Sequence, residues 1–126
     1  MDFSIGEFSA ITGLSVYTLR YYEKEKLIIP ARKNNGRRCY SDRDLNWVQF
    51  IKRLKDTNMP IKEIQKYAVL RANGDSTFLD RMKMLKNHRA VLQKAIAEYQ
   101  EHLGHLNDKI AFYQEAINKQ AMDREL

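Results

Sequence analysis

Residues 4–23 have the sequence SIGEFSAITGLSVYTLRYYE, which predicts two short helices joined by a tight turn. Ser4 and Glu7 fit a capping box, in which the hydroxyl accepts from the Glu7 amide and the carboxylate reaches back. Gly13 permits the left-handed turn that ends the first helix, and Ser15 can cap a second helix running to about Lys26. The apolar residues expected to face inward are Phe8, Ile11, Leu14 and Leu19. Together these features predict a helix-turn-helix.

A basic hairpin is expected after the second helix. Leu27-Ile28-Ile29 is a strand-like run that Pro30 ends, and residues 37–40 (Arg-Arg-Cys-Tyr) form the expected return strand. Between them, Asn34-Asn35-Gly36 contains the Asn-Gly pair that is typical of a tight type I′ turn. Because a ribbon this basic is unsuited to a core, we expect a wing that lies against phosphate groups.

Two further helices are expected before residue 73. Ser41 begins the third helix, with Asp42 and Asp44 in the first turn, where the helix dipole favours acids. Pro60 suits the first turn of a fourth helix that continues to about Ala72. Apolar residues recur at helical spacing in both helices, and they are Leu45, Trp47, Val48, Phe50, Ile51, Leu54, Ile61, Ile64, Tyr67, Ala68 and Leu70.

A seven-residue repeat begins after residues 73–76, which we interpret as a hinge. Its apolar positions, at alternating steps of four and three, are Phe78, Met82, Leu85, Leu92, Ile96, Tyr99, Leu103, Leu106, Ile110, Tyr113 and Ile117. This repeat predicts a coiled-coil helix over residues 77–117, followed by a short tail over residues 118–126. A helix of roughly forty residues reaches about 60 Å, too long to bury its stripe against one small domain. We therefore expect a homodimer formed through this helix.

Charge divides the chain at the same place. Residues 1–72 hold 14 Lys and Arg against 8 Asp and Glu, whereas residues 73–126 hold 8 of each. The whole surplus of +6 therefore lies in the first part of the chain. Such a concentrated positive charge is typical of a domain that binds a polyanion.

Composition excludes several classes of protein. No apolar stretch approaches the roughly 18 residues needed to span a bilayer, and the N-terminus lacks the bases of an export signal. A single cysteine, Cys39, excludes an internal disulfide and fits a reducing compartment, so we expect a cytoplasmic protein without membrane association. Because the sequence has no Gly-rich phosphate loop and no His-rich cluster, we expect neither an enzyme nor a cofactor.

The sequence resembles the MerR (mercury-resistance regulator) family of bacterial transcription regulators over residues 3–71. The segments that carry the resemblance are residues 4–8 (Ser-Ile-Gly-Glu-Phe), 12–15 (Thr-Gly-Leu-Ser), 18–23 (Thr-Leu-Arg-Tyr-Tyr-Glu) and 36–41 (Gly-Arg-Arg-Cys-Tyr-Ser), with Asp44-Leu45 close behind. The resemblance implies a mainly α fold, in which a winged helix-turn-helix DNA-binding domain with a small β-hairpin wing precedes a long coiled-coil dimerisation helix.

The resemblance also implies a DNA-binding surface. The residues that match the start of the recognition helix, which enters the major groove, are Ser15, Val16, Tyr17 and Thr18. Those that match positions near phosphates or the minor groove are Arg20, Tyr21, Arg37, Arg38 and Tyr40, with Arg32 assisting. Two positions depart from the family pattern. Tyr17 stands at a position that is often Lys or Arg in the family, which affects the preference for particular DNA base pairs. Arg37 stands at a position that is often aromatic, which favours phosphate binding.

A mechanism is implied by the same resemblance. Family members bind near-palindromic promoter DNA as homodimers, between elements whose spacer is too long for RNA polymerase. The effector-bound form bends and untwists that DNA, so polymerase is a partner only through the double-stranded promoter. Nine residues follow Ile117, too few for the ligand-binding domain of multidrug-sensing relatives. The effector, the operator and the direction of regulation stay open.

Some side chains have two interpretations. Cys39 is either a redox or electrophile sensor or, the commoner case, a small half-buried strand residue. His102 and His105 are three apart on one helix, but two ligands are too few for a tight metal site, so no metal is expected. Tyr99 and Tyr113 either line an effector pocket or, as aromatic residues at core spacing more often do, act as bulky coiled-coil knobs.

Arg89 interrupts the seven-residue repeat, and it either faces a carboxylate, marks the end of the regular repeat or sets the register of the helix pair. An alternative function is a coiled-coil adaptor whose basic domain binds an acidic protein. Gel shifts separate the two functions. A regulator prefers its own promoter's near-palindrome over random DNA at fixed salt concentration, and an adaptor does not.

Overall fold

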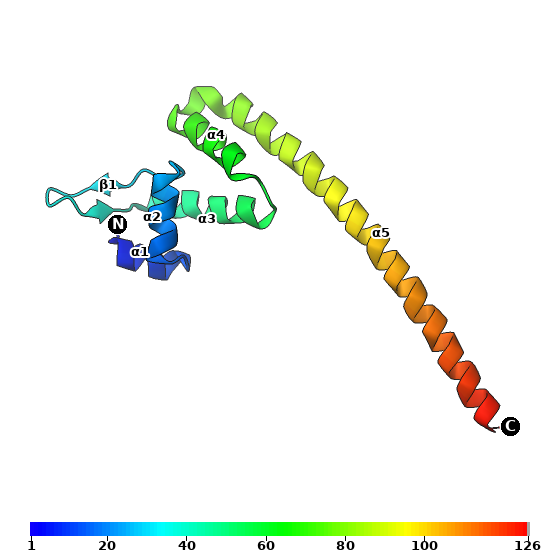
Figure 1. Cartoon of the computed structure of the whole chain (residues 1–126). Helices are drawn as coiled ribbons and strands as arrows, with labels where there is room; N and C mark the ends of the chain where they lie inside the picture. The colour runs from blue at the N-terminus through cyan, green and yellow to red at the C-terminus, as the bar shows by residue number, and fades with distance from the viewer. Residues whose placement is uncertain (126) are drawn as a thin grey trace. The chain divides into compact units, whose positions relative to one another are not determined.

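The computed structural model describes residues 1–125, and Leu126 lies outside the described part of the chain. The chain divides into two compact units, of which the first, Met1–Leu85, is called the head below. The elements of the chain (Figure 1) are α1 (Ile5–Thr12), α2 (Val16–Lys24), β1 (Ala31–Arg32), β2 (Arg38–Cys39), α3 (Asp42–Asp56), α4 (Ile61–Ala72), the 3₁₀ turn η1 (Asp75–Thr77) and α5 (Phe78–Glu125). The fold is therefore mainly helical with one small hairpin, as predicted.

The helix-turn-helix forms through the local signals found in the sequence. Ser4 Oγ accepts from the Glu7 amide at 3.1 Å, and the Glu7 carboxylate accepts from the Ser4 amide at 2.9 Å. Gly13 ends α1 in the left-handed conformation, with a φ of 75°. The second helix ends at Lys24 rather than near Lys26, because Lys26 itself has a φ of 60°.

The inward faces of α1 and α2 are largely as predicted. Phe8 and Leu19 are fully buried, and Leu14 packs against the core. The prediction for Ile11 is wrong, because its side chain is 44% exposed. The buried face of α1 is set by Phe8 and Thr12, one helical turn apart, and the Thr12 hydroxyl donates to the Phe8 carbonyl at 2.8 Å.

The first strand of the hairpin lies later in the chain than predicted. Leu27 and Ile28 are buried, but they precede the strand and fill the core as irregular backbone. Ala31 and Arg32 form β1 and pair antiparallel with β2. An apolar run that is needed inside a small core therefore need not be a strand.

The turn of the hairpin is also different from the prediction. A type I′ turn requires positive φ at both central residues, but in this loop only Gly36 has a positive φ, of 82°. The Gly36 amide donates to the Lys33 carbonyl at 2.8 Å, and the Lys33 amide donates to the Arg37 carbonyl at 2.9 Å. These bonds close a three-residue loop whose last residue is the glycine, a common alternative to the two-residue turn.

One core, built from aromatic and aliphatic side chains, joins the elements of the head. The Phe8 and Tyr40 rings stack with centroids 4.3 Å apart, and the Trp47 and Tyr67 rings stack at 5.7 Å. The Trp47 indole donates to the Leu27 carbonyl at 2.8 Å, which ties α3 to the loop after α2. The buried apolar residues are Phe3, Phe8, Leu19, Tyr22, Leu27, Ile28, Tyr40, Trp47, Val48, Ile51, Leu54, Met59, Ile64 and Tyr67.

The segment interpreted as a hinge forms a hydrogen-bonded turn between α4 and α5. Gly74 has a φ of 88°, and η1 follows it. The Thr77 hydroxyl donates to the Leu70 carbonyl at 2.6 Å and to the Gly74 carbonyl at 2.7 Å. Arg81 reinforces the turn from α5, because its guanidinium donates to Thr77 Oγ1 and to the Gly74 carbonyl, both at 3.1 Å.

The long helix extends beyond the predicted coiled-coil segment. It has 48 residues, so it is about 72 Å long, and the predicted tail is helical as far as Glu125. Residues 118–125 contain no proline or glycine, so nothing ends the helix at Ile117. None of its described side chains is buried. Among the described residues no helix is both long and apolar enough to cross a membrane.

Candidate nucleic-acid interface

The outer face of α2 carries two aromatic and two basic side chains. Tyr17, Arg20, Tyr21 and Lys24 lie at helical spacing on one side of the helix, where they line a shallow hollow of about 270 Å³. Tyr17 is 81% exposed and Tyr21 is 39% exposed, whereas Leu19 on the opposite side is fully buried. Packing against the core therefore fixes the helix and leaves this face open to a partner.

The first turn of α2 uses two of its hydroxyl groups for its own cap. Ser15 Oγ accepts from the Thr18 amide at 3.0 Å and donates to Thr18 Oγ1 at 2.9 Å. Val16 and Thr18 are half-buried. Tyr17, which is 81% exposed, is therefore the side chain of this turn that is open to a partner, whereas Ser15 and Thr18 are engaged in the cap.

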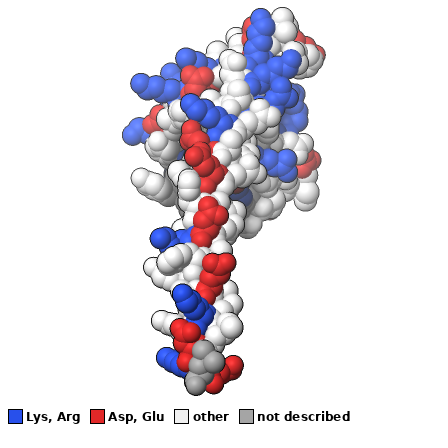
Figure 2. Space-filling view, turned by 90° about the vertical axis from the view of Figure 1, so that its right-hand side faces the viewer, with Lys and Arg blue, Asp and Glu red and all other residues white. Residues whose placement is uncertain are grey.

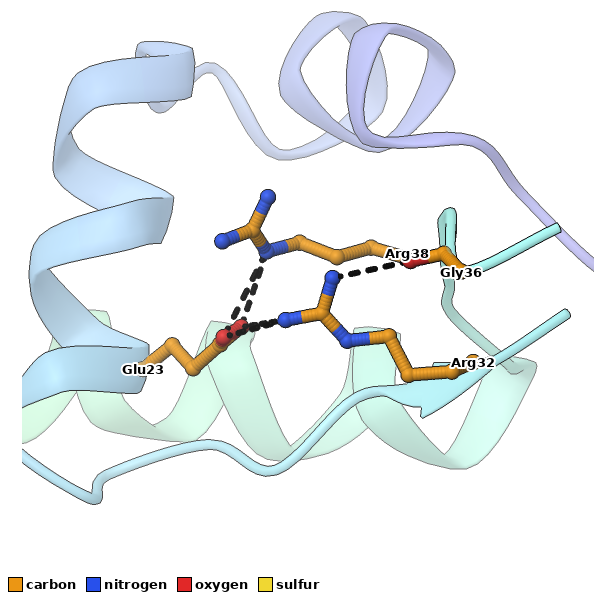
Figure 3. Close-up of polar contacts among 4 residues, drawn as sticks. All are labelled: Glu23, Arg32, Gly36 and Arg38. Carbon is orange, nitrogen blue, oxygen red and sulfur yellow. Dashed lines mark hydrogen bonds and ion pairs between the residues drawn. The ribbon is translucent and has the colours of Figure 1, made fainter.

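Glu23, near the end of α2, fixes the position of the β1–β2 hairpin, called the wing below (Figure 3). Its carboxylate accepts from Arg38 Nε at 2.8 Å and from Arg32 Nη2 at 3.1 Å. Arg32 Nη1 also donates to the Gly36 carbonyl at 3.1 Å, which braces the loop of the wing. The hydrogen bond with Glu23 raises the pKa of the Arg38 guanidinium. One carboxylate therefore joins both strands of the wing to α2.

Three arginines keep donors available after these bonds are made. The terminal nitrogens of Arg38 point away from Glu23 in Figure 3, and only its Nε is used. Arg20 and Arg37 are exposed and have no side-chain hydrogen bond or ion pair within the described residues. Arg32, by contrast, uses both terminal nitrogens, Nη1 on the Gly36 carbonyl of the wing and Nη2 on the Glu23 carboxylate of α2, so its role is mainly to position the wing.

These side chains meet in a hollow of about 510 Å³, called the basic cleft below. Its lining residues come from α1, α2 and the wing, and they are Ser4, Ile5, Gly6, Arg20, Arg32, Asn35, Gly36, Arg37 and Arg38. No acidic side chain lines it. The first amides of α1, at Ile5 and Gly6, have no acceptor within the helix, so they add donors to the arginines. On the face of the molecule that Figure 2 shows, which is seen from the side away from the wing, Lys and Arg side chains are also prominent, with Asp and Glu side chains among them.

Tyr40 is a correction to the predicted site. Its side chain is 1% exposed, and its ring stacks on Phe8 in the core. Its backbone pairs with Phe3 on both sides, through bonds of 2.7 and 2.9 Å. Burial raises the pKa of the Tyr40 hydroxyl, which has no hydrogen-bond partner within the described residues. Tyr40 is therefore a core residue and cannot lie against a phosphate.

Sequence reasoning gave no role to Glu23, although it lies within the Arg-Tyr-Tyr-Glu segment. The available signal was an acid in the middle of the most basic part of the chain. Its partners lie 9 and 15 residues further along the chain, so the pairing depends on the fold of the wing. Asn35 was also assigned only to the turn, and the structure places it in the basic cleft.

The other candidate sites show simpler surroundings. Cys39 lies in β2 and is half-buried, as the commoner interpretation predicts. His102 and His105 are exposed on α5, and His105 Nε2 lies 3.9 Å from the Glu101 carboxylate. Within residues 1–125 no three His, Cys, Asp or Glu side chains gather as metal ligands.

The apolar stripe of α5 is called the seam below. Most of its members are exposed. The exposed members are Phe78, Met82, Ile96, Tyr99, Leu103, Leu106, Ile110, Tyr113 and Ile117. Leu92 is half-exposed, and Leu85 packs against the core of the head. Arg89 is exposed as well. The seam is therefore a long apolar surface that is open to solvent in the single chain.

Comparisons with known proteins match this architecture. Residues 3–69 match the MerR HTH family of regulatory proteins, and residues 45–109 match the family described as MerR, DNA binding. An HTH-type transcriptional regulator of Haemophilus influenzae is 35% identical over 117 residues, which cover 92% of this chain and 87% of the relative. The HTH-type transcriptional regulator AdhR of Bacillus subtilis is 36% identical over 68% of this chain and 62% of its own length.

Solved structures agree with the sequence relatives. HiNmlR, a MerR family regulator lacking the sensor domain, solved bound to promoter DNA, has a TM-score of 0.80 and 35% identity, over 92% of this chain and 93% of its own. A MerR family transcriptional regulator from Listeria monocytogenes has a TM-score of 0.84 and 31% identity, over 97% of this chain and 98% of its own. The likeness therefore includes both the head and the long helix.

Proposed function

This chain belongs to the MerR HTH family of regulatory proteins, and we propose that it binds a near-palindromic promoter operator as a homodimer. It is a DNA-binding transcription regulator, not an enzyme. The observation that carries the proposal is the junction of recognition helix and wing through Glu23, which makes one basic surface from two elements. HiNmlR, whose fold this chain shares over most of its length, was solved on promoter DNA.

The exposed residues of α2 suit the major groove. Tyr17 and Tyr21 offer rigid apolar arms that end in a hydroxyl, which can contact a base edge or a phosphate. Arg20 lies between them and also lines the basic cleft, so it suits a phosphate at the rim of the groove. Because Ser15 and Thr18 bond each other, Tyr17 sets the base preference more than they do.

The wing suits the phosphates beside the groove. Arg37 is fully available and Arg38 offers its terminal nitrogens, whereas Arg32 holds the wing in place. A phosphate in the basic cleft would meet the Arg38 guanidinium, which Glu23 already holds in place, and the guanidinium groups of Arg20 and Arg37, which are unbonded within the described residues. The loss of side-chain entropy on binding is therefore small for Arg38 only.

The seam supports a homodimer. A chain with this stripe exposed would offer a long apolar surface to solvent, and a second copy supplies a matching stripe by symmetry. Two heads joined in this way bind two half-sites, which is why a near-palindrome is the expected operator. Once the first head is bound, the second head binds its half-site in an intramolecular step.

The regulatory step is the part that rests on family resemblance. We expect the dimer to distort the spacer DNA of its promoter, so that RNA polymerase is affected through the DNA rather than by direct contact. Promoter DNA is the proposed partner, and we expect the protein to act in the cytoplasm, where bacterial DNA lies.

A binding assay tests the proposal directly. The full chain is titrated into the labelled near-palindrome from its own promoter and into a shuffled duplex of the same length, at one salt concentration. We expect the affinity for the near-palindrome to exceed that for the shuffled duplex by about 10³ or more. Equal affinities would contradict sequence-specific binding and would favour the adaptor.

A further inference from the structure

A second hollow of the head lies where α3, α4 and the start of α5 meet. It has a volume of about 220 Å³ and is called the aromatic cleft below. Its lining residues are Asn46, Trp47, Phe50, Tyr67, Arg71 and Arg81, none of which lines the basic cleft. The proposed DNA-binding surface therefore does not include this hollow, and DNA binding gives it no role.

Three aromatic rings form the walls of the aromatic cleft. Trp47 stacks on Tyr67 with centroids 5.7 Å apart, and Phe50 lies tilted at 5.7 Å from Tyr67 and 6.4 Å from Trp47. Trp47 and Tyr67 are 6% and 8% exposed, so their positions are fixed by the core. The walls are thus held in place and offer ring edges to a planar ligand.

Arg71 places an unpaired positive charge in the aromatic cleft. Its guanidinium lies 4.7 Å from the centroid of the Trp47 ring, and within residues 1–125 it has no hydrogen-bond acceptor and no ion-pair partner. Burial, and then the positive charge of Arg43, lower the pKa of the Arg71 guanidinium, whereas the negative charge of Asp44, which does not line the cleft, raises it. The five N–H donors of this half-buried guanidinium therefore lack an acceptor from the described residues, and a ligand could supply one.

Arg81 adds a second cation to the aromatic cleft. Its Nε and Nη2 bond Thr77 and the Gly74 carbonyl, so the group is held in place and its Nη1 stays available. No carboxylate lines the cleft. Two fixed guanidinium groups without an acid between them attract an anion, and the aromatic walls favour one with a flat apolar part.

We propose that the aromatic cleft binds a small planar organic anion, namely an aromatic carboxylate with a single ring. The carboxylate accepts two hydrogen bonds from Arg71, and its ring lies against the aromatic walls. The volume of about 220 Å³ is below the roughly 300–1,000 Å³ typical of drug-sized ligands, which limits the ligand to one ring. As a regulatory site this inference rests on the proposed function, because the cleft lies within the head, where α3 and α4 meet the start of α5.

The test measures binding without DNA, so that it is independent of the proposed function. Trp47 is the only tryptophan of the chain, so a ¹⁵N-labelled sample of the full chain gives one indole N–H signal at the wall of the cleft. Benzoate is the probe. Benzamide is its neutral counterpart of the same shape, and acetate is a carboxylate without a ring. We expect benzoate to move the indole signal saturably, with an affinity about tenfold or more above that of benzamide or acetate.

Variants locate the binding. Arg71→Met should weaken benzoate binding by about tenfold or more, because the charge-assisted hydrogen bonds are lost. Arg53→Met is the matched control, since Arg53 is exposed on α3 and lines neither cleft, and it should bind benzoate as the unaltered chain does. Circular dichroism checks that each variant is folded.

Several results would overturn the inference. They are an indole signal that benzoate does not move, equal affinities for benzoate and benzamide, and a folded Arg71→Met variant with unchanged affinity. If acidic side chains of a second copy fill the aromatic cleft in solution, benzoate will not move the signal, and the inference fails by the first of these results. The comparison of benzoate with benzamide on the unaltered chain remains decisive even if Arg71→Met does not fold.

Discussion

The head and the helix beyond it treat the same kinds of residue in opposite ways. Tyr67 in the head is 8% exposed, and Ile64 is fully buried. On α5, Tyr99 is 75% exposed and Ile96 is 48% exposed. The head therefore contains its own hydrophobic core, whereas the apolar stripe of α5 gains its burial only from another surface.

This difference separates two tasks that DNA binding requires. The head holds every side chain that we assign to DNA, and its core fixes their positions. The seam holds none of them, yet in the proposed dimer it determines how many heads act together. Contact and affinity should therefore be separable by mutation, and each of the following changes tests one side of that division.

The largest effect is expected from breaking the seam. Ile96→Asp places a charge where the partner helix would bury it, so the dimer should dissociate. Loss of the second head should lower affinity for the near-palindrome by about 10²–10⁴, with salt-dependent non-specific binding retained. Sedimentation velocity measures whether the chain is a dimer, and fluorescence anisotropy measures its affinity for the near-palindrome. The matched control is Ala97→Asp, which adds the same charge at the next, exposed position outside the seam.

The division between DNA contact by the head and dimerisation by the seam fails if sedimentation and DNA affinity do not change together. A folded Ile96→Asp chain that sediments as a monomer but binds the near-palindrome with unchanged affinity would show that one head is sufficient. Dissociation by Ala97→Asp as well would show that the seam has a different register from the one assigned.

Within the head, a smaller effect is expected from one phosphate contact. Arg20→Ala should weaken binding to all duplexes and reduce the salt dependence by about one unit of slope. Arg53→Ala removes the same charge from an exposed position outside the basic cleft, so its salt slope should stay unchanged. A change of preference at one base pair, with an unchanged slope, would assign Arg20 to base reading instead.

Local signals explain what the sequence predicted well. The capping residues Ser4, Ser15 and Ser41 each begin a helix where expected, because a cap depends only on residues three positions away. The repeat of seven predicted the long helix for the same reason. Its end was missed, since no breaking residue separates Ile117 from the residues that follow.

The errors at Leu27, Ile28, Tyr40 and Glu23 concern contacts between distant parts of the chain. Leu27 and Ile28 have strand-forming composition, but the core of the head uses them as filling. Tyr40 resembles a surface residue of a basic wing until Phe3 and Phe8 are seen to cover it. Glu23 acquires its role only when the wing folds back on α2. None of these pairings leaves a periodic signal in the sequence.

Tyr40→Phe tests the corrected position of this side chain, with a modest expected effect. The buried hydroxyl has no partner within the described residues, so its removal relieves an unsatisfied polar group. We expect the free energy of unfolding to rise by about 1 kcal/mol, measured by urea denaturation, with DNA affinity unchanged. A fall in DNA affinity at fixed salt concentration, with the fold intact, would restore Tyr40 to the interface.

The smallest effect is expected from Cys39→Ser. Cys39 is half-buried in β2, where its side chain is a small filler beside the wing arginines, and serine is nearly the same size. The free energy of unfolding should change by less than about 1 kcal/mol, and the salt slope should be unaltered. Regulation in cells exposed to aldehydes or oxidants should persist, because a structural cysteine is inert unless its thiolate is exposed. Loss of induction with unchanged DNA affinity would make Cys39 the switch. The head would then sense a signal as well as bind DNA, and a separate effector at the junction with α5 would not be needed.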